Sequence, residues 1–373
     1  MSTVRANQIL DAAGGNTAQI NGMTPTAQSL QGFRNRIING NMVIDQRNAG
    51  ASVTPTGYQY TVDRWAADPT AASKFSVQQN AGSVTPPAGF RNYLGITSLS
   101  AYSASASDYF ALTQTIEGFN VADLNFGTAN ASTFTISFWV RSSLTGTFGG
   151  SLLNSGASRG YVFSYTINAA NTWEFKTVTV AGDQSGSWAT TNGNGIQLNF
   201  SIGAGSNWIG SAGSWGGSRL YAPTGQVSVV GTNGATFFIT GVQLEAGSVA
   251  TPFERRDYGR ELMMCQRYLP AWTAPNNQYF GQGWAYSTGA SLFTLVSPVV
   301  TRVPVTGVTT SGSFRVLIAG AGAVDPTSVT FSSGSTSNLT VVANATSGYT
   351  SGGGTGLYAS SGTSTILGTG CEL

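Results

Sequence analysis

The side chains in this sequence that could recognise a ligand are mainly aromatic. Three tryptophans lie in Gly-, Ser- and Asn-rich stretches that predict loops, namely Trp188, Trp208 and Trp215, and Arg219 follows the last of them. A second aromatic set comprises Trp272, Tyr279, Phe280, Trp284 and Tyr286. Aromatic rings can stack on sugar rings, so the candidate glycan contacts are Trp188, Trp208, Trp215, Arg219, Trp272, Tyr279, Trp284 and Tyr286. Packing in a core or in a subunit interface is the alternative role for each aromatic residue.

The sequence offers few groups for covalent or metal chemistry. It contains no histidine, which excludes Ser-His-Asp and Cys-His catalysis and removes the commonest transition-metal ligand. The two cysteines, Cys265 and Cys371, are too distant in sequence to indicate a zinc site, and we expect free thiols. No phosphate-binding glycine motif is present. We therefore expect no catalytic residue, no metal, no cofactor and no enzymatic activity.

Glycoside hydrolysis is the one reaction that this composition leaves open, because it needs only two carboxylates about 5 to 10 Å apart. The acidic candidates, none of which belongs to a cleft motif, are Glu117, Asp123, Glu174, Asp183, Glu245 and Glu254. The short stacked repeats of a parallel β-helix are absent from the sequence. A surface-polysaccharide depolymerase is thus a less favoured alternative.

Composition indicates an all-β protein. Only 9% of the 373 residues are charged, whereas hydrophobic residues make up 41% and glycine occurs 49 times. A net charge of +2 gives no basic surface for nucleic acid. Neither an export signal nor an 18-residue apolar run is visible, so we expect assembly in a cytoplasm without membrane insertion.

Alternating apolar residues predict a β-sandwich over residues 34–255. The alternation is clearest at 134–141 and 196–202, and further strands are expected at 161–167, 173–180, 225–230 and 236–245. Such alternation predicts antiparallel sheets with one buried face and one solvated face. Two sheets packed face to face in a jelly-roll-like arrangement would satisfy it.

The flanking segments predict three further parts. Residues 1–33 have few apolar side chains and suggest either a disordered tail or an extended arm that attaches to a partner. Residues 256–270 predict a connector helix that Asp257 caps, with Tyr258, Leu262, Cys265 and Leu269 on its apolar stripe. Residues 271–373 predict a small β-rich tip domain with strands at 291–297, 299–305, 314–320, 328–332, 338–343 and 356–360.

Two motifs resemble those of bacteriophage tail fibre and tail appendage proteins. The first runs through Ile37, Ile38, Asn39, Gly40, Asn41, Gln46, Arg47, Tyr60, Thr61, Asp63, Arg64 and Trp65. The second runs through Gln243, Leu244, Glu245, Gly247, Ala250, Thr251, Pro252, Phe253, Glu254, Cys265, Gln266, Arg267 and Tyr268. Together they bracket about two-thirds of the chain.

The resemblance implies a sandwich similar to carbohydrate-binding modules on a homotrimeric fibre. Residues 1–33 would attach to a tail or baseplate protein, and the tip would be distal, facing a bacterial surface glycan. The motif residues themselves suggest structural roles: a buried Asp63–Arg64 pair beside a core Trp65, loop contacts for Gln243, Glu245 and Glu254, and helix anchoring by Arg267 and Tyr268.

Alternative functions remain open from the sequence. A purely structural virion protein, such as a baseplate or neck appendage or a capsid decoration, would have the same fold without receptor binding. A secreted bacterial carbohydrate-binding module is less favoured because no export signal is seen. The favoured hypothesis is a trimeric tail fibre in the virion that contacts a glycan through its sandwich loops or its tip.

Overall fold

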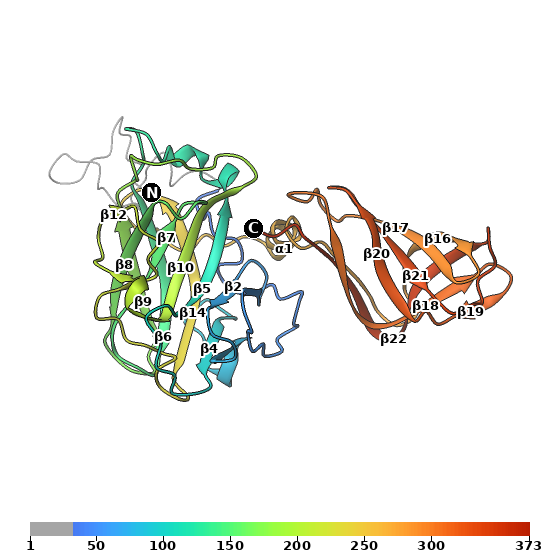
Figure 1. The fold of residues 1–373 in the computed structure, drawn as a ribbon, viewed down its shortest axis with the longest axis horizontal. Coiled ribbons are helices and arrows are strands. Elements are labelled where there is room, and N and C mark those ends of the chain that lie inside the picture. Colours follow the sequence, from blue (N-terminus) through green and yellow to red (C-terminus); the bar gives the residue numbers. More distant parts are fainter. Residues whose placement is uncertain (1–32) are drawn as a thin grey trace, which may run out of the picture. The chain divides into compact units, whose positions relative to one another are not determined.

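The computed structural model describes residues 33–373, which form two compact units (Figure 1). The sandwich unit comprises residues 33–43, 50–61 and 65–255. The C-terminal unit comprises residues 44–49, 62–64 and 256–373. The predicted attachment arm over 1–33 lies outside the described residues except for Phe33. Two short segments within the predicted sandwich domain therefore belong to the C-terminal unit.

The sandwich unit is built from a seven-stranded and a five-stranded sheet (Figure 1). The larger sheet has the order β1 (Gln59–Tyr60), β2 (Ala66–Pro69), β5 (Tyr109–Glu117), β10 (Asn194–Ala204), β7 (Gly146–Leu153), β8 (Gly160–Ile167) and β12 (Trp215–Gly216). The smaller sheet has the order β3 (Phe75–Gln79), β4 (Leu94–Ser98), β14 (Thr236–Ala246), β6 (Phe134–Ser142) and β9 (Glu174–Val180). Neighbouring strands within each sheet are antiparallel, which confirms the predicted all-β sandwich.

Short elements complete the sandwich unit. A parallel pair joins β11 (Ile209–Gly210) to β13 (Ala222–Pro223). Single 3₁₀ turns occur at η1 (Ala81–Ser83), η2 (Gly118–Asn120), η3 (Ala122–Leu124) and η4 (Ser206–Trp208).

The sandwich core forms as the alternation predicts. The alternating apolar residues of 134–141 and 196–202 are almost completely buried and point between the two sheets; they are Phe134, Ile136, Phe138, Val140, Ile196, Leu198, Phe200 and Ile202. The ring of Phe138 on β6 lies 5.0 Å, centroid to centroid, from Phe200 on β10 and 5.0 Å from Tyr165 on β8. Edge-to-face contacts of this kind add to the hydrophobic effect that holds the sheets together.

The outer face of the seven-stranded sheet is covered, which the sequence did not predict. Asn199 and Ser201 were expected in solvent, but both are fully buried. The Asn199 amide donates to the Ser151 hydroxyl, and the Gln226 amide donates to that of Ser201, so the buried polar atoms are satisfied. The predicted strand at 225–230 is wrong, because this segment crosses the sheet instead of joining it: the N–H groups of Val229 and Val230 share the Ile202 carbonyl.

One α-helix, α1 (Tyr258–Gln266), opens the main part of the C-terminal unit. Asp257 caps it as predicted, with its carboxylate accepting a 2.9 Å hydrogen bond from Arg260 N. Cys265 is buried, as predicted, but Tyr258 is 61% exposed, so the expected apolar stripe is wrong at its first position. The buried face instead carries Glu261, Cys265 and Gln266.

The remaining C-terminal strands form one curled antiparallel sheet. Its order is β19 (Gly322–Val324), β18 (Gly307–Ile318), β22 (Gly354–Thr369), β16 (Tyr279–Ser287), β17 (Ala290–Val296), β21 (Asn338–Asn344) and β20 (Ser328–Gly334), with β15 (Ala271–Ala274) pairing β22. Val316 of β18 and Val329 of β20 share one hydrophobic core although their strands are far apart in the sheet. The sheet must therefore curl so that one face packs on itself. The predicted strand at 299–305 is wrong, since this segment is a loop that delivers Val305 to the core.

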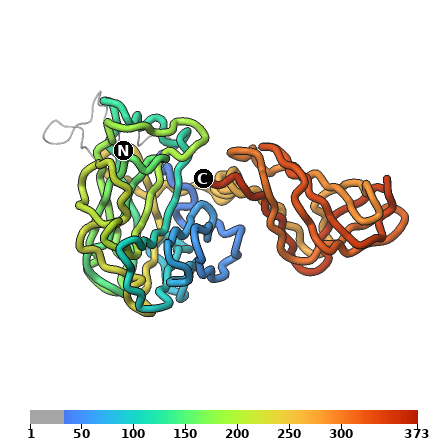
Figure 2. Tube along the Cα trace, in the orientation of Figure 1, coloured from blue at the N-terminus to red at the C-terminus, as the bar shows by residue number. Residues whose placement is uncertain are grey.

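Residues 371–372 return to the neighbourhood of α1 (Figure 2). The Arg302 guanidinium donates to the carbonyls of Cys371 and Glu372, and the Arg302 N–H donates to the carbonyl of Arg267 just after the helix. Both cysteines are buried free thiols.

The Asn-Gly-Asn turn of the first motif packs directly against β14. Val242 N donates to the Gly40 carbonyl at 2.9 Å, and Ile37 and Ile38 beside it are buried. A Cβ atom on Gly40 would lie 2.1 Å from the Val242 carbonyl oxygen, closer than any side chain can approach. The glycine is therefore required by the contact between this turn and the strand.

Replacing Gly40 with alanine should lower the free energy of unfolding by about 1–3 kcal/mol, because the added methyl group overpacks this contact. Thermal and denaturant unfolding would measure the change. Gly57→Ala is the matched control, since a Cβ there has no atom within 4 Å, and it should shift stability by less than about 0.5 kcal/mol. Equal effects of the two variants would contradict this account of the motif.

Candidate functional site

An aromatic pair stands on the outer face of the five-stranded sheet. Strands β6 and β9 are antiparallel with Trp139 directly opposite Phe175, and their ring centroids are 5.4 Å apart. The neighbours of Trp139 on β6, Phe138 and Val140, are fully buried between the sheets, so Trp139 points away from the core. Phe175 is 47% exposed. This face of the sandwich thus presents aromatic surface to solvent.

An irregularity in β14 makes room beside this pair. The pairing of β14 with β6 shifts between Thr240 and Gln243, and Gly241 has a φ of +63°. A Cβ on Gly241 would lie 2.7 Å from Phe90 Cζ and 3.3 Å from Trp139 Cδ1. Only glycine therefore allows Phe90 and Trp139 to approach each other across the strand.

The second motif folds the chain back over the same face after β14. The buried Glu245 carboxylate accepts hydrogen bonds from Thr251 N at 2.8 Å and Thr251 Oγ1 at 2.6 Å. Gln243 Oε1 accepts from Glu254 N at 2.7 Å, and Glu254 Oε2 accepts from Asn35 N at 2.7 Å. These contacts give Gln243, Glu245 and Glu254 a structural task, which is to fix the path of residues 251–255.

The returning segment supplies the last wall of a hollow. Phe253 lies 5.3 Å from Phe90 between ring centroids, and the Arg255 guanidinium lies 4.8 Å over the Phe90 ring. The hollow encloses about 270 Å³ and is called the aromatic groove below; its lining residues are Phe90, Ser137, Trp139, Phe175, Gly241, Thr251, Pro252, Phe253 and Arg255. Exposed ring faces with a few polar groups around them suit a ligand that is apolar on its faces and polar at its edge.

The loop tryptophans predicted as glycan contacts lie outside the aromatic groove. Trp188 and Trp215 meet each other, with centroids 5.5 Å apart, and both contact Phe126. The indole N–H of Trp188 donates to the Ser185 carbonyl and that of Trp215 to the Ala181 carbonyl. Each ring is partly buried. The pair therefore packs loops together and leaves only part of each ring for a ligand.

Trp208 and Arg219 belong to another cluster, on the outer face of the seven-stranded sheet. Trp208 contacts Tyr109 and Tyr221, whose rings stack 4.0 Å apart, and the Arg219 guanidinium lies 5.8 Å from the Trp208 ring. Asp68 accepts from both tyrosine hydroxyls at 3.3–3.4 Å. Burial raises the pKa of Asp68, while Arg219 opposes this shift. The sequence therefore grouped three tryptophans that the fold separates into two clusters.

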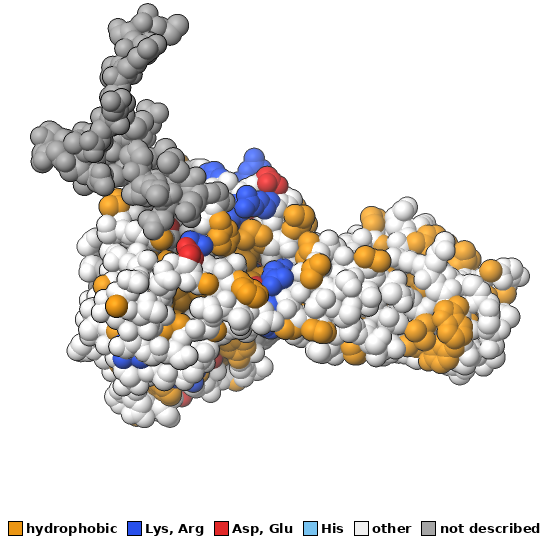
Figure 3. Space-filling model, turned by 90° about the horizontal axis from the view of Figure 1, so that it is seen from above, with side chains coloured by type: hydrophobic (Ala, Val, Ile, Leu, Met, Phe, Trp, Pro, Cys, Tyr) orange, Lys and Arg blue, Asp and Glu red, His pale blue; other side chains and the backbone are white. Residues whose placement is uncertain are grey.

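The predicted tip residues differ in their exposure. Tyr279, Trp284 and Tyr286 are 43–52% exposed, whereas Trp272 packs on the core and its indole donates to the Val296 carbonyl. In Figure 3 the visible face of the C-terminal unit shows one larger hydrophobic patch and several smaller ones in a mostly white, uncharged surface. This unit thus offers aromatic surface in an uncharged setting.

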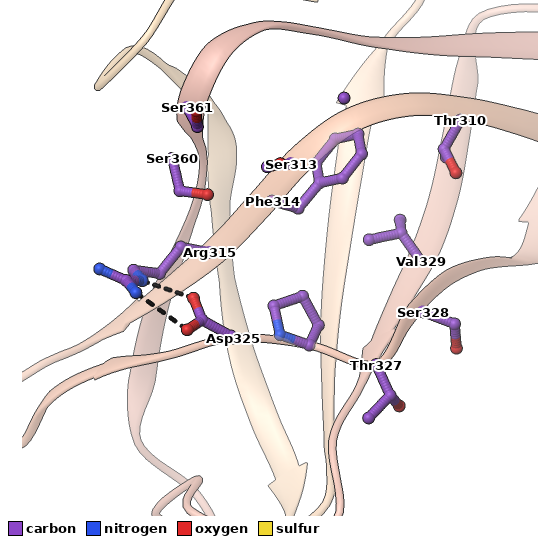
Figure 4. Close-up of a pocket in the computed structure, with 12 residues that line it drawn as sticks. Thr310, Ser313, Phe314, Arg315, Asp325, Thr327, Ser328, Val329, Ser360 and Ser361 are labelled. Atoms are coloured by element: carbon purple, nitrogen blue, oxygen red, sulfur yellow. Dashed lines mark hydrogen bonds and ion pairs between the residues drawn. The ribbon is translucent and has the colours of Figure 1, made fainter.

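A polar hollow of about 560 Å³ opens between β18, β20 and β22 (Figure 4). Its lining residues are Thr310, Gly312, Ser313, Phe314, Arg315, Asp325, Pro326, Thr327, Ser328, Val329, Ser360 and Ser361. Arg315 and Asp325 form a two-point ion pair at one end, with Nε–Oδ1 at 2.5 Å and Nη2–Oδ2 at 2.9 Å. Hydroxyl groups predominate elsewhere, so this hollow is suited to hydrogen bonding.

The remaining residues of the two motifs meet in the C-terminal unit. The Arg64 guanidinium lies 3.6 Å over the Tyr268 ring and pairs with Glu372 at 2.5 Å. Arg47 pairs with the other oxygen of Glu372 at 2.8 Å. Arg267 approaches the Val300 carbonyl at 3.4 Å. Glu372, more than 300 residues away, is a partner of the Arg64 guanidinium that the sequence did not predict.

Asp63 and Trp65 flank Arg64 and have different environments. Trp65 fills the sandwich core and its indole donates to the Asn39 carbonyl. Asp63 is buried and accepts hydrogen bonds from Gln46 N at 3.0 Å and from Gln46 Nε2. Burial raises the pKa of Asp63 to about 7, and the two bonds from Gln46 oppose the rise.

The raised pKa of Asp63 predicts that stability falls as pH rises from about 4 to about 7. In that interval the folded chain keeps the Asp63 proton while the unfolded chain loses it, so each pH unit costs up to about 1.4 kcal/mol. Urea unfolding at pH 5, 6, 7 and 8 would measure the slope. Asp63→Asn should flatten it, and an unchanged slope in that variant would contradict the assignment.

The acidic residues considered for hydrolysis are engaged in separate local contacts. Asp123 pairs with Arg36, Asp183 with Arg159, and Glu174 with Lys176. Among residues 33–373 no group of three His, Cys, Asp or Glu side chains is placed to hold a metal ion. No helix in this described range is long and apolar enough to cross a membrane.

Comparison with known proteins finds likeness in fold but not in sequence. No protein-family model and no curated protein sequence matches the chain. One similar structure is the enzymatically active domain of tailspike protein 4 of bacteriophage CBA120, with 13% identity, a TM-score of 0.30, and a match covering 58% of this chain and 22% of that one. Another is the family 11 carbohydrate-binding module of a Clostridium thermocellum cellulosomal cellulase, with 10% identity, a TM-score of 0.26, and 55% and 100% covered.

A third similar structure corrects one expectation. It is the arabinose-bound α-L-arabinofuranosidase MgGH51, with 14% identity, a TM-score of 0.30, and a match covering 54% of this chain and 28% of that one. An arabinofuranosidase and an enzymatically active tailspike domain thus occur among the structures that resemble the chain. The prediction that excluded enzymatic activity is therefore wrong. Hydrolysis by two carboxylates needs no histidine, so the absence of histidine does not exclude it.

The residues of the aromatic groove were not among the sequence candidates, although two signals were available. Trp139 occupies the polar side of the alternation at 134–141, and Phe175 shares its side of the strand with Thr177 and Thr179. A large aromatic on the solvent face of a strand marks a surface worth examining. What the sequence could not supply is the pairing that places Trp139 opposite Phe175.

Proposed function

We propose that this chain is a glycan-binding structural protein of a bacteriophage tail, and that the aromatic groove of its sandwich unit binds the glycan. The observation that carries the binding role is the exposed pair Trp139 and Phe175, with Phe90, Phe253 and Arg255 as neighbours. The two rings, tilted by 50° to each other, offer apolar surface to the C–H faces of a sugar. Ser137, Thr251 and the Arg255 guanidinium line the same hollow and can meet its hydroxyl groups.

The construction of the groove supports this proposal. Its aromatic walls come from four separate segments: strand β6, strand β9, the loop containing Phe90, and the returning residues 251–255. Glycine at 241 and the Glu245 network hold these segments in position, so the groove exists before any ligand arrives. Preformed sites bind more tightly because less conformational entropy is lost on binding.

Trp139→Ala should weaken oligosaccharide binding by about tenfold, or about 1.4 kcal/mol, because it removes the central stacking surface. Titration calorimetry with the full chain and a panel of oligosaccharides would measure the loss. Trp188→Ala is the matched control, since Trp188 is also partly exposed but lies in another cluster. This variant should bind the oligosaccharide with unchanged affinity. Equal affinity of the two variants would remove the groove as the site.

The place of the chain in a tail is a further part of the proposal. It is supported by the two motifs that resemble those of tail fibre and tail appendage proteins. The chain would form a homotrimer in the virion, attach to a tail or baseplate protein through residues 1–33, and face a bacterial surface glycan. A small, curled tip with few charges is a domain that gains stability from association with neighbouring copies.

Native mass spectrometry of the full chain should give three times its 38.6 kDa mass. Antibody labelling in electron micrographs of the phage that carries the protein should place the subunit on the tail. A monomeric mass would reject the trimer, and label on the head shell would reject the fibre position.

A further inference from the structure

Two glycines of β22 lie on the outer face of the curled C-terminal sheet, where Gly354 is exposed and Gly356 is buried. Thr355 and Leu357 point inward and are buried, so Gly354 and Gly356, which alternate with them, face away from the core. Gly356 lies opposite Gln282 of β16 on one side and Leu317 of β18 on the other. The backbone of β22 is therefore the floor of a trough between two side-chain rows.

The walls of this trough are largely exposed hydrophobic side chains. Tyr279 is 52% exposed and Leu317 is 41% exposed. A Cβ on Gly356 would lie 2.7 Å from Tyr279 Cε1, so the tyrosine ring leans over the glycine and presents its other side outward. The trough encloses about 570 Å³ and also includes Gln282, whose amide can donate and accept.

One end of the trough is polar without net charge. Tyr358 of β22 lies opposite Tyr279 of β16, and their ring centroids are 5.3 Å apart. On the β18 side, Tyr358 lies opposite Arg315. Arg315 is held in the two-point pair with Asp325, which Figure 4 shows beside the neighbouring hydroxyl-lined hollow. Both partners remain accessible, since their side chains are 42% and 65% exposed. Their charges compensate each other, so an ionic ligand gains little there.

We propose that this trough binds a neutral saccharide. A sugar ring lies over Gly354 with a C–H face against the outward side of the Tyr279 ring, and its hydroxyl groups reach the Gln282 amide and the Arg315–Asp325 pair. A bulky side chain at 354 would fill the space that the ring needs. The trough belongs to the C-terminal unit and shares no residue with the aromatic groove, so it does not rest on the function proposed for the sandwich unit.

The test uses the full chain with the groove variant Trp139→Ala as background, so that binding at the other site does not obscure the result. The probes are β-1,4-linked hexaoses of glucose, galactose and mannose, with oligogalacturonate as the acidic counterpart. Tyr279→Ala should weaken binding of at least one neutral hexaose by about tenfold. Affinity should not change between 50 and 500 mM NaCl, because neither partner carries net charge.

Tyr286→Ala is the matched control, because Tyr286 is on the same strand, is 43% exposed and does not line the trough. It should leave the affinity unchanged. Gly354→Val should abolish binding by filling the floor, because a Cβ there has no atom within 4 Å and the substitution causes no clash in the fold. The proposal is overturned if no neutral hexaose binds, or if Tyr279→Ala and Tyr286→Ala weaken the affinity for the hexaose equally. It is also overturned if Tyr279→Ala changes only the oligomeric mass.

Discussion

A buried carboxylate that must be satisfied determines how the sandwich unit presents its surface. Glu245 is 2% exposed at the end of β14, and an unpaired carboxylate there would cost several kcal/mol. It is satisfied only when Thr251 and Gln243 donate to it, which requires the chain to turn back across the sheet. Phe253 and Arg255 follow directly, so the outer wall of the aromatic groove depends on the hydrogen bonds of one side chain.

The fold class was predictable because the hydrophobic effect imposes a period of two on strands that bury one face. Residues 134–141 and 196–202 carry this period and are buried as expected. The errors arise where a second layer covers the other face. Asn199 alternates like a solvated residue, yet it is fully buried. Tyr221, 22 residues further along the chain, packs on Ala111 and Leu153 of the same sheet, and nothing local in the sequence announces such a cover.

The candidate sites were less predictable, since a site depends on distant segments. Trp188, Trp208 and Trp215 share a composition of neighbours but not a location, because strand order decides which loops meet. Trp139 and Phe175 are 36 residues apart and become neighbours only through the register of β6 and β9. The motif residues Gln243, Glu245 and Glu254 were expected in loop contacts, and their hydrogen bonds lie in such a loop.

The C-terminal unit is discontinuous in sequence: it takes in residues 44–49 and 62–64, and its residue 372 pairs with Arg47 and Arg64. During synthesis, the ion pairs of Arg47 and Arg64 cannot form until residue 372 has left the ribosome. An exchange of tips between related genes at residue 256 would keep Arg47 and Arg64 but remove Glu372, the carboxylate that both arginines pair with. Such recombination should therefore succeed only among sequences that retain both halves of this arrangement.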